Sequence, residues 1–165
     1  MTSYDHYISP LGKIILATDG KSITDCRFAG QKYFEKIPTA WIKSSNNQIL
    51  KNAIQQILEY FMKNRTIFTL AISAVGTPFQ KQVWNAISKI PYGQTANYKS
   101  IAEKIGTPKS VRAVATAIGK NPLCIIVPCH RVIGTDGSLT GYAGGLWRKK
   151  WLLEHESPSA QQSLF

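Results

Sequence analysis

The chain has 165 residues, 44% of which are hydrophobic, and carries a formal net charge of +11. A chain of this size can bury one substantial core or two small ones, and the positive charge favours an anionic partner such as nucleic acid over an acidic small molecule. No apolar run approaches the roughly 18 residues of a membrane span, and the amino terminus lacks the basic and apolar regions of a signal peptide. We therefore expect a soluble, cytoplasmic protein with no membrane partner.

The cysteines and glycines argue against several kinds of site. Cys26, Cys124 and Cys129 form an odd set without the spacing of a disulfide framework, which fits a reducing compartment. A zinc site built from Cys124, Cys129, His130 and His155 would lack any paired ligand spacing. The glycine-rich stretch near the carboxy terminus lacks the lysine and serine of a phosphate-binding loop. We expect no metal, no cofactor and no nucleotide hydrolysis.

The first half of the chain predicts a small antiparallel sheet covered by one helix. Strand signals separated by turn sequences occupy residues 4–9, 13–18 and 22–28. Asn46 or Asn47 is placed to cap a helix that runs to about Asn64, because apolar residues recur there at helical spacing. Residues 66–72 predict one more strand, and the break at 73–78 marks a domain boundary.

The second half predicts short helices with tight glycine turns, which is typical of a helix-turn-helix. The helices are expected at residues 78–90, 98–105 and 110–119. The last of them is rich in small residues, so it either approaches a partner surface closely or packs tightly in the core. A loop at 134–145 and a closing helix at about 146–154 follow, and the polar tail at 157–165 is expected to be flexible.

The stretch around Pro128 carries the clearest chemical signal. An apolar run of strand character, residues 125–127, is followed directly by Cys129, His130 and Arg131. A thiol reacts as its thiolate, and the histidine and the arginine are groups that can stabilise this anion. Neighbours on an extended segment point to opposite faces, so His130 reaches the sulfur only through a turn or a bridging water. The competing interpretation is a buried, unreactive cysteine beside a surface histidine.

A carboxylate further along the chain extends this signal. Glu156 follows the predicted closing helix and could orient His130 as the third member of a Cys-His-Glu relay. Taken alone, a glutamate near a chain end is much more often a solvated charge.

Five ordered motifs place these residues in a wider pattern: Arg112-Ala113-Val114, Asn121-Pro122, Pro128-Cys129-His130-Arg131-Val132, Gly141-Tyr142-Ala143-Gly144-Gly145 and Leu152-Leu153-Glu154-His155-Glu156. With them the chain from about Thr77 to Glu156 resembles the O6-alkylguanine-DNA alkyltransferases, and the amino-terminal part is similar more loosely. The resemblance implies an α/β (α+β) fold. Residues 1–75 would form a ribonuclease-H-like domain with an antiparallel sheet, and residues 76–156 a winged helix-turn-helix domain that binds DNA and accepts the alkyl group.

The resemblance also implies a reaction. Cys129 would take the alkyl group from O6-alkylguanine in DNA in a single displacement that inactivates the protein, with O4-alkylthymine as an open second substrate. The residue matching His130 acts as a base through a water, and the one matching Glu156 orients it. Asn121 matches an asparagine that ties the active turn together. Tyr98 matches a tyrosine that donates to the guanine ring as negative charge develops.

Further residues take their expected roles from the same resemblance. Tyr142 would wall the base pocket, the Val132 carbonyl and the Ala143 N–H would contact the guanine, and Lys149 matches a lysine near the site. The base must leave the duplex, so Arg112 would fill the gap while Ala113 and its helix lie in the minor groove. Double-stranded DNA carrying O6-alkylguanine is the expected partner of a monomeric protein. The chain departs from the common family pattern at Ala115 and Thr116, where glycine is often found.

Two other functions remain open at this point. One is a non-catalytic binder of alkylated DNA, as in the alkyltransferase-like proteins, which replace the acceptor cysteine; Cys129 is present here. The other is a cysteine hydrolase built on Cys129, His130 and Glu156.

Overall fold

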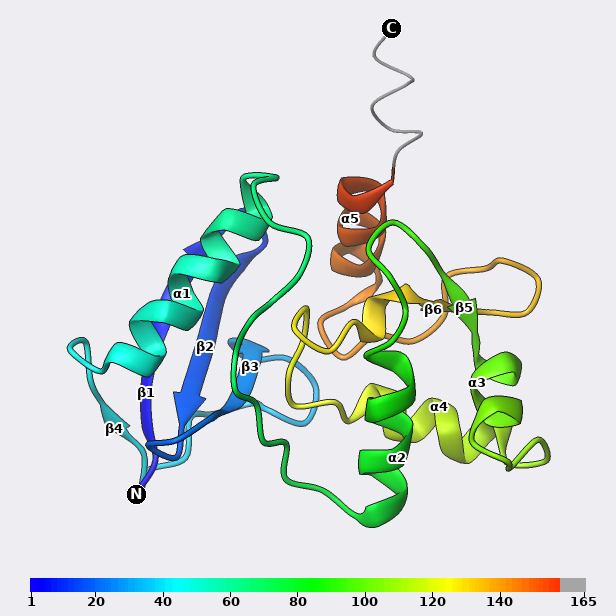
Figure 1. Cartoon of the computed structure of the whole chain (residues 1–165), viewed down its shortest axis with the longest axis horizontal. Helices are drawn as coiled ribbons and strands as arrows, with labels where there is room; N and C mark the ends of the chain where they lie inside the picture. The colour runs from blue at the N-terminus through cyan, green and yellow to red at the C-terminus, as the bar shows by residue number, and fades with distance from the viewer. Residues whose placement is uncertain (158–165) are drawn as a thin grey trace, which may run out of the picture. The chain divides into compact units, whose positions relative to one another are not determined.

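The structure, a computed structural model, describes residues 1–157, so the predicted flexible tail lies outside the described residues except for Ser157. The elements follow one another as shown in Figure 1: β1 (Ser3–Ser9), β2 (Gly12–Thr18), β3 (Ile23–Phe28), β4 (Ile42–Lys43), α1 (Gln48–Phe61), α2 (Pro78–Ile87), β5 (Ala96–Asn97), α3 (Tyr98–Lys104), α4 (Val111–Gly119), a 3-10 turn (Cys129–Arg131), β6 (Val132–Ile133) and α5 (Leu146–Glu156). Within this part of the chain, no helix combines the length and the hydropathy needed to cross a membrane.

The chain divides into two compact units. The first comprises Met1–Val75 together with Pro122–Ile126, and the second comprises Gly76–Asn121 and the chain from Val127 onward. The first unit therefore takes a short segment from the second half of the sequence. This division differs from the proposed domains, 1–75 and 76–156, only by that segment.

The first unit is built on a four-stranded sheet in the order β3-β2-β1-β4. β1 and β2 form an antiparallel hairpin, and β2 pairs antiparallel with β3. The hairpin turn is closed by Ser9, whose hydroxyl donates to the Gly12 carbonyl at 2.7 Å and accepts from the Leu11 N–H at 3.0 Å. The three predicted strands are confirmed. β4 was not predicted, because two residues are too few to show a periodicity.

Helix α1 packs along one face of this sheet (Figure 1), where it contacts β1, β2 and β3. Asn47 caps it, since its side chain accepts from the backbone N–H groups of Ile49 at 2.9 Å and Leu50 at 3.1 Å. The apolar stripe of the helix is buried, including Leu50, Ala53, Ile57 and Tyr60. The predicted helix is confirmed, and it begins at the predicted cap.

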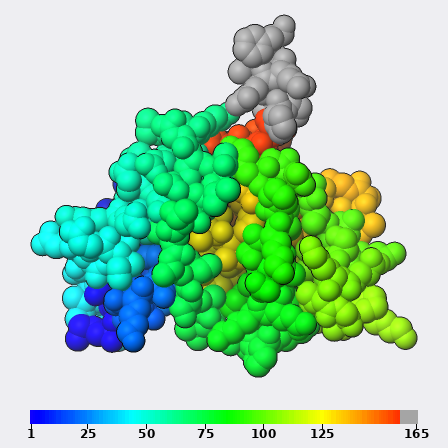
Figure 2. Space-filling model, in the orientation of Figure 1, coloured from blue at the N-terminus to red at the C-terminus, as the bar shows by residue number. Residues whose placement is uncertain are grey.

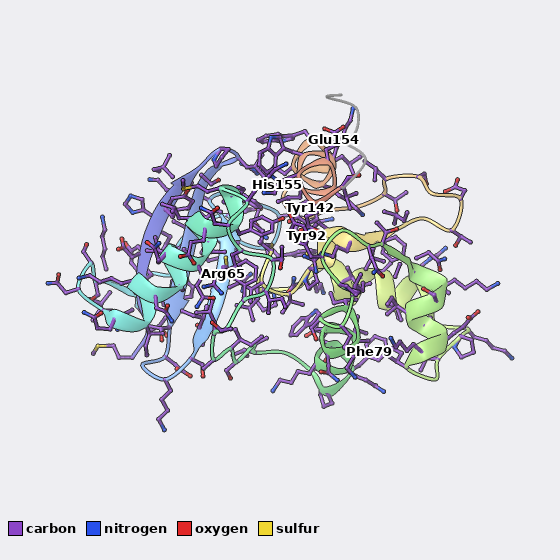
Figure 3. The ribbon with its side chains drawn as sticks, turned by 45° about the horizontal axis from the view of Figure 1, so that its top comes forward. Arg65, Phe79, Tyr92, Tyr142, Glu154 and His155 are labelled. Carbon is purple, nitrogen blue, oxygen red and sulfur yellow. The ribbon has the colours of Figure 1, made fainter. Side chains whose placement is uncertain are left out.

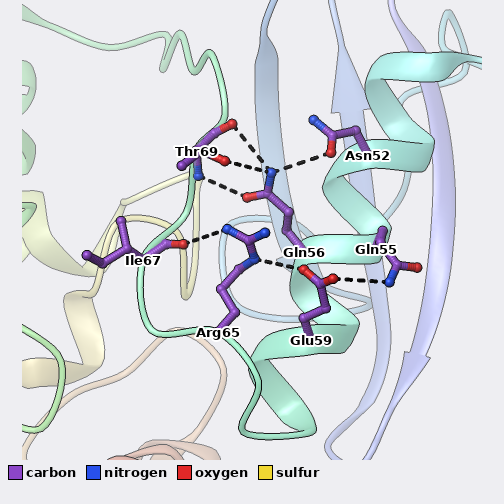
Figure 4. Close-up of polar contacts among 7 residues, drawn as sticks. All are labelled: Asn52, Gln55, Gln56, Glu59, Arg65, Ile67 and Thr69. Atoms are coloured by element: carbon purple, nitrogen blue, oxygen red, sulfur yellow. Dashed lines mark hydrogen bonds and ion pairs between the residues drawn. The ribbon is translucent and has the colours of Figure 1, made fainter.

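The strand predicted at residues 66–72 is wrong. The segment is irregular and makes a single parallel bridge, between Ile72 and Ile23 of β3. Its backbone is held by the side chain of Gln56 on α1, which accepts from the Thr69 N–H at 2.9 Å and donates to the Thr69 hydroxyl at 3.1 Å (Figure 4). Arg65 adds an ion pair to Glu59 at 2.9 Å. A side chain thus replaces the ladder partner that the strand pattern demands.

The second unit contains the three predicted helices as α2, α3 and α4. Thr77 and Gln80 form a capping box at the start of α2, and Pro78 occupies the first turn. Trp84 of α2 donates from Nε1 to the Ala117 carbonyl of α4 at 2.8 Å, which fixes the two helices together inside a buried contact. α3 and α4 form the helix-turn-helix, and β5 pairs in parallel with β6.

The apolar run at 125–127 is not the strand that its pattern predicts. The chain forms one parallel bridge before it, between Leu123 and Cys26, where the Cys26 N–H donates to the Pro122 carbonyl at 2.8 Å and the Cys124 N–H to the Cys26 carbonyl at 2.8 Å. It then turns sharply at Ile125, which has a φ of 74°. The outer edge of β3 is therefore paired at both ends by irregular segments, around Ile72 and around Leu123.

Candidate active site

Two consecutive tight turns precede Cys129 and position it. At the first, Ile125 has a φ of 74° and the Ile126 N–H donates to the Cys124 carbonyl at 2.9 Å, a γ-turn that is strained for a β-branched residue. At the second, Pro128 has φ −81° and ψ 64°, and the Cys129 N–H donates to the Val127 carbonyl at 2.8 Å, an inverse γ-turn. The chain therefore enters the 3-10 turn at Cys129 with its direction fixed.

Asn121 holds the second of these turns from the end of α4. Its side-chain Nδ2 donates to the Val127 carbonyl at 2.8 Å, and the side chain is buried. The Val127 carbonyl thus accepts from both the Asn121 amide and the Cys129 N–H. This arrangement couples helix α4 to the turn that carries the thiol, and Cys129 itself is only 5% exposed.

His130, Glu156 and Arg131 form a buried polar network beside the thiol. The Nε2 atom of His130 lies 2.7 Å from Oε2 of Glu156. Arg131 binds the same carboxylate with two nitrogens, Nε to Oε1 at 2.7 Å and Nη2 to Oε2 at 3.1 Å, and its Nη1 donates to the Ile90 carbonyl at 2.7 Å. All three side chains are buried, so the interactions act in a medium of low dielectric constant.

Protonation states follow from burial and from the permanent charge of Arg131. Burial lowers the pKa of His130 below its ordinary value; its bond to Glu156 opposes the shift and the charge of Arg131 adds to it. Burial alone would raise the pKa of Glu156, but hydrogen bonds and charge from His130 and Arg131 hold it well below its usual range. Because arginine does not lose its proton, we assign an ionised Glu156 and a neutral His130.

This assignment fixes the tautomer of His130. Its Nε2 carries the proton and donates to the Glu156 carboxylate, so Nδ1 is the acceptor. Nδ1 is buried and has no protein hydrogen-bond partner among the described residues. A neutral imidazole with one nitrogen anchored and the other open to accept is the arrangement of a general base.

A second cluster joins Tyr98, Lys149 and the loop before α5. The Tyr98 hydroxyl donates to the Thr140 carbonyl at 2.9 Å. The Lys149 ammonium donates to the same carbonyl at 2.7 Å, to the Gly141 carbonyl at 3.3 Å and to the Tyr98 hydroxyl at 3.4 Å. Burial raises the pKa of Tyr98, and the charge of Cys129 acts in the same direction. The phenol is therefore a proton-bearing donor at neutral pH.

Lys149 is the cation of this cluster. Burial lowers the pKa of Lys149 to about 8, and the charge of Cys129 acts against that shift. The attraction between two opposite charges is mutual. An ammonium at Lys149 therefore stabilises the Cys129 thiolate, and Lys149 remains largely protonated at neutral pH.

Tyr92 contacts helix α5, and Tyr142 lies in the loop that precedes this helix. The Tyr92 hydroxyl donates to the His155 carbonyl of α5 at 3.5 Å, and both residues are labelled in Figure 3. The guanidinium carbon of Arg131 lies 5.7 Å from the centre of the Tyr92 ring. Tyr142 precedes α5 in the loop that ends at Gly145, and its hydroxyl oxygen is buried. Tyr142, the predicted pocket wall, thus has a buried hydroxyl, and Tyr92 is a contact of α5 that the sequence did not single out.

The exposed face of α4 carries the predicted DNA contacts. Arg112, Ala113 and Thr116 are exposed, whereas Val114 and Ala117 face the core. A groove of about 600 Å³ runs between this face and the start of α2, lined by Thr77, Phe79, Gln80, Lys109, Ser110, Arg112, Ala113, Thr116 and Ala117. Phe79 is labelled in Figure 3, and Figure 2 shows green atoms of α2 beside yellow-green atoms of the α3 region on one face.

The structure joins several of the predicted site residues through three contacts within the second unit. Asn121 contacts the turn before Cys129, His130 contacts Glu156, and Lys149 contacts Tyr98. Val132 begins β6 in register with Ala96, and Ala143 lies in the loop before α5. Arg112 and Ala113 lie apart from these contacts, on the exposed face of α4.

Arg131 has hydrogen-bond partners that its place in the sequence does not indicate. It was interpreted as a group that stabilises the thiolate, but its guanidinium binds Glu156 and the Ile90 carbonyl. Successive side chains in a 3-10 turn point about 120° apart. A turn predicted at Cys129–Arg131 would therefore have indicated that Arg131 and Cys129 point in different directions. No group of three or more His, Cys, Asp or Glu side chains suited to a metal occurs within residues 1–157.

Comparison with known proteins gives matches over almost the whole chain. Residues 3–74 match the ribonuclease-like domain of 6-O-methylguanine DNA methyltransferase, and residues 78–158 match its DNA binding domain. A Methanosarcina barkeri protein named methylated-DNA–protein-cysteine methyltransferase is 46% identical over 153 residues, which are 93% of this chain and 96% of that protein. A protein of the same name from Mycolicibacterium paratuberculosis is 43% identical over 164 residues, 99% and 98% of the two chains.

Solved structures match equally well. The crystal structure of Mycobacterium tuberculosis OGT in complex with DNA has a TM-score of 0.87 to this chain at 40% identity, and the match covers 99% of each chain. The fold predicted from the sequence is therefore confirmed for both units.

Proposed function

Because the chain belongs to the 6-O-methylguanine DNA methyltransferase family, we propose that it repairs DNA by direct reversal and transfers the alkyl group of O6-alkylguanine to its own Cys129. Relatives named methylated-DNA–protein-cysteine methyltransferase match it over nearly their whole length. The observation that carries the assignment to Cys129 is the buried network directly after it, in which His130 is held at 2.7 Å by an ionised Glu156.

The proposed reaction is a single displacement at carbon. His130 Nδ1 accepts the thiol proton of Cys129 through a bridging water, and the Lys149 ammonium stabilises the thiolate. The sulfur then bonds to the alkyl carbon while the bond from that carbon to O6 breaks, and the electron pair remains on the guanine. Tyr98 donates a hydrogen bond to the ring as this charge develops. The guanine anion then takes up one proton, which balances the proton that the Cys129 thiol gave up to His130, so the products are a thioether and an unmodified guanine.

Three further residues are proposed to hold the base. Tyr142 lines the pocket, the Val132 carbonyl accepts from the guanine amine, and the Ala143 N–H donates toward O6. Support comes from the anchoring of the loop before α5, since Lys149 binds the carbonyls of Thr140 and Gly141. A loop held at its backbone can present a donor without much loss of conformational entropy.

Double-stranded DNA is the proposed partner, in agreement with the relative that was crystallised with DNA. The net charge of +11 and the exposed Arg112 and Ala113 on α4 support binding through this helix. Arg112 would fill the gap that the extruded nucleotide leaves, and a few kcal/mol of lost stacking must be offset by such contacts. A monomeric state and a cytoplasmic location remain predictions.

The decisive experiment measures where the alkyl group goes and how often. The protein is incubated with an excess of duplex carrying O6-methylguanine with a labelled methyl group, and labelled peptides are identified by mass spectrometry. We expect a plateau at one methyl group per chain, on the peptide that contains Cys129, because a thioether offers no route for hydrolysis.

The same assay separates the two other functions. A non-catalytic binder would bind the duplex, and the protein would stay unlabelled. This function is less supported, because the relatives that match over their full length are named as methyltransferases and because Cys129 is present. A hydrolase would continue past one equivalent with Cys129 recovered unmodified.

A further inference from the structure

The first turn of α5 presents an aromatic ring and a guanidinium that the proposed reaction does not use. Trp147 is 59% exposed, although it is among the largest apolar side chains of the protein. The guanidinium carbon of Arg148 lies 4.6 Å from the centre of the Trp147 ring, and its Nη1 donates to the Gly144 carbonyl at 3.0 Å. Tryptophan and arginine are the residues most often enriched where a protein surface binds a partner.

This pair is held in place by the chain around it. Gly145 has a φ of 93°, and a Cβ built there would lie 3.3 Å from Cδ1 of Trp147, so the edge of the indole rests against the backbone. Two residues further on, Lys149 anchors the same turn through its bonds to the Thr140 and Gly141 carbonyls, at 2.7 and 3.3 Å. A ring and a cation that are already ordered lose little conformational entropy when they bind.

The positive charge around Trp147 and Arg148 favours a negatively charged partner. The sequence from residue 140 to residue 153 contains no acidic residue, and Arg148, Lys149 and Lys150 are consecutive. Lys150 is exposed. An exposed indole beside cations suits single-stranded or distorted nucleic acid, because bases stack on aromatic rings and guanidinium groups pair with phosphate.

We propose that Trp147 and Arg148 form a second DNA contact, on the damaged strand next to the extruded nucleotide. Trp147 contacts a neighbouring base or sugar, and Arg148 the phosphate that follows it. The inference rests on the proposed function, since the loop that leads into Trp147 contains Tyr142 and Ala143, to which that function assigns the extruded base. The α5 contact is separate from the α4 face, which carries Arg112.

Binding is measured by fluorescence anisotropy with a labelled duplex carrying one O6-methylguanine, in a Cys129→Ser background so that no transfer occurs. Trp147→Ala should raise Kd about 5- to 30-fold, and Trp147→Phe should restore it to within about threefold of the parent. Arg148→Gln should reduce the slope of log K against log salt by about one. With Cys129 intact, Trp147→Ala should leave the rate of reaction with free O6-benzylguanine unchanged, because the free base has no strand.

Tyr33→Ala is the matched control. Tyr33 is also an exposed aromatic residue, 49% exposed, with a lysine over its ring, since Lys32 Nζ lies 5.2 Å from the ring centre. It belongs to the first unit, and the variant should bind the duplex as the parent does.

Three results would overturn the proposal: unchanged Kd in Trp147→Ala, equal losses in Trp147→Ala and Tyr33→Ala, or a parallel loss of the O6-benzylguanine reaction, which would make Trp147 a support of the pocket. A partner other than DNA at this surface would give the first of these. If the Cys129 protein bound the duplex without accepting a methyl group, the proposed function would fail while the anisotropy series still decided the α5 contact.

Discussion

Arg131→Met tests whether the buried network sets both the stability of the protein and the protonation of His130. The substitution keeps an apolar stem of similar length and removes the guanidinium. Glu156 loses two hydrogen bonds, at 2.7 and 3.1 Å, and the Ile90 carbonyl loses a donor at 2.7 Å. Breaking a buried ion pair on one side destabilises by about 3–5 kcal/mol. For a chain of this length, that corresponds to a fall in Tm of roughly 10 °C.

The same variant should change the pH dependence of alkyl transfer. In the parent protein the pKa of His130 lies below its ordinary value because of burial, and the charge of Arg131 contributes to the shift. Removing Arg131 raises the pKa of His130. His130 is therefore protonated up to a higher pH, and below that pH it cannot act as a base. The acid limb of the rate, measured with O6-benzylguanine, should therefore move to higher pH in Arg131→Met.

Stability against pH gives an independent check with a defined sign. The pKa of Glu156 is depressed in the folded protein, so its contribution is fully present above its unfolded pKa, about 4.3, and is lost as the pH falls through the folded value. Arg131→Met reduces that depression. The difference in Tm between parent and variant should thus be largest near neutral pH and shrink below about pH 4.

Two controls decide the interpretation. Arg65→Met breaks the surface ion pair with Glu59, also 2.9 Å long, and should leave Tm almost unchanged. Arg131→Met combined with Glu156→Met removes both buried charges and should recover much of the lost stability, but not the activity. A Tm in Arg131→Met that matched the Arg65→Met control, together with an unmoved acid limb, would refute the role assigned to the network.

Three further predictions concern the site. Cys129→Ser should abolish methyl transfer in the labelling assay while changing the duplex Kd by less than about threefold, because phosphate contacts dominate affinity; transfer that persisted would move the nucleophile elsewhere. Arg112→Ala should slow repair of duplex far more than reaction with O6-benzylguanine, since only the duplex leaves a gap to fill, and equal losses would make Arg112 structural. Lys149→Met should slow transfer roughly tenfold or more. Because the pKa of Lys149 is about 8, the rate of the parent protein should decline above that pH, and the variant should lack this decline. A decline that persisted in the variant would belong to another group.

The sequence predicted the regular elements because their patterns are local. Helix α1 is marked by apolar residues at helical spacing and by the Asn47 cap, and both signals act within a few residues. The three strands of the first sheet are marked by turns at Pro10–Gly12 and Asp19–Gly20. Such patterns hold wherever one face of an element is buried against the rest of its unit.

The two strand predictions that failed did so for tertiary reasons. Residues 66–72 have strand character, but Gln56 takes the backbone groups of Thr69 that a neighbouring strand would bind. Residues 125–127 are apolar and β-branched, yet Ile125 adopts a φ of 74°. Nothing in the identity of an isoleucine indicates a positive φ, which is set by the partners of its neighbours.

The site was accessible from sequence only in part. The motif around Cys129 is contiguous, and Glu156 was first considered as a partner of His130 from its type and place, with the resemblance to a family adding support for that role. In the second cluster, Tyr98 meets Thr140 and Lys149, which lie 42 and 51 positions further along the chain, and no periodicity connects them. Arg131 was named, from its closeness in sequence, as a group that could stabilise the thiolate, and its hydrogen bonds to Glu156 were not predicted.

The pairing of Pro122–Ile126 with the first unit bears on how the gene could be divided. A protein beginning at residue 76 would contain the segment without its β3 partner, and the first unit alone would present the outer edge of β3 around Cys26 unpaired. Unpaired strand edges promote aggregation. The two halves are thus better regarded as complementing fragments than as independent modules. Produced separately they should be poorly soluble, and produced together they have a hydrogen-bonded edge through which to reassociate, which ends at Cys124, five residues before Cys129.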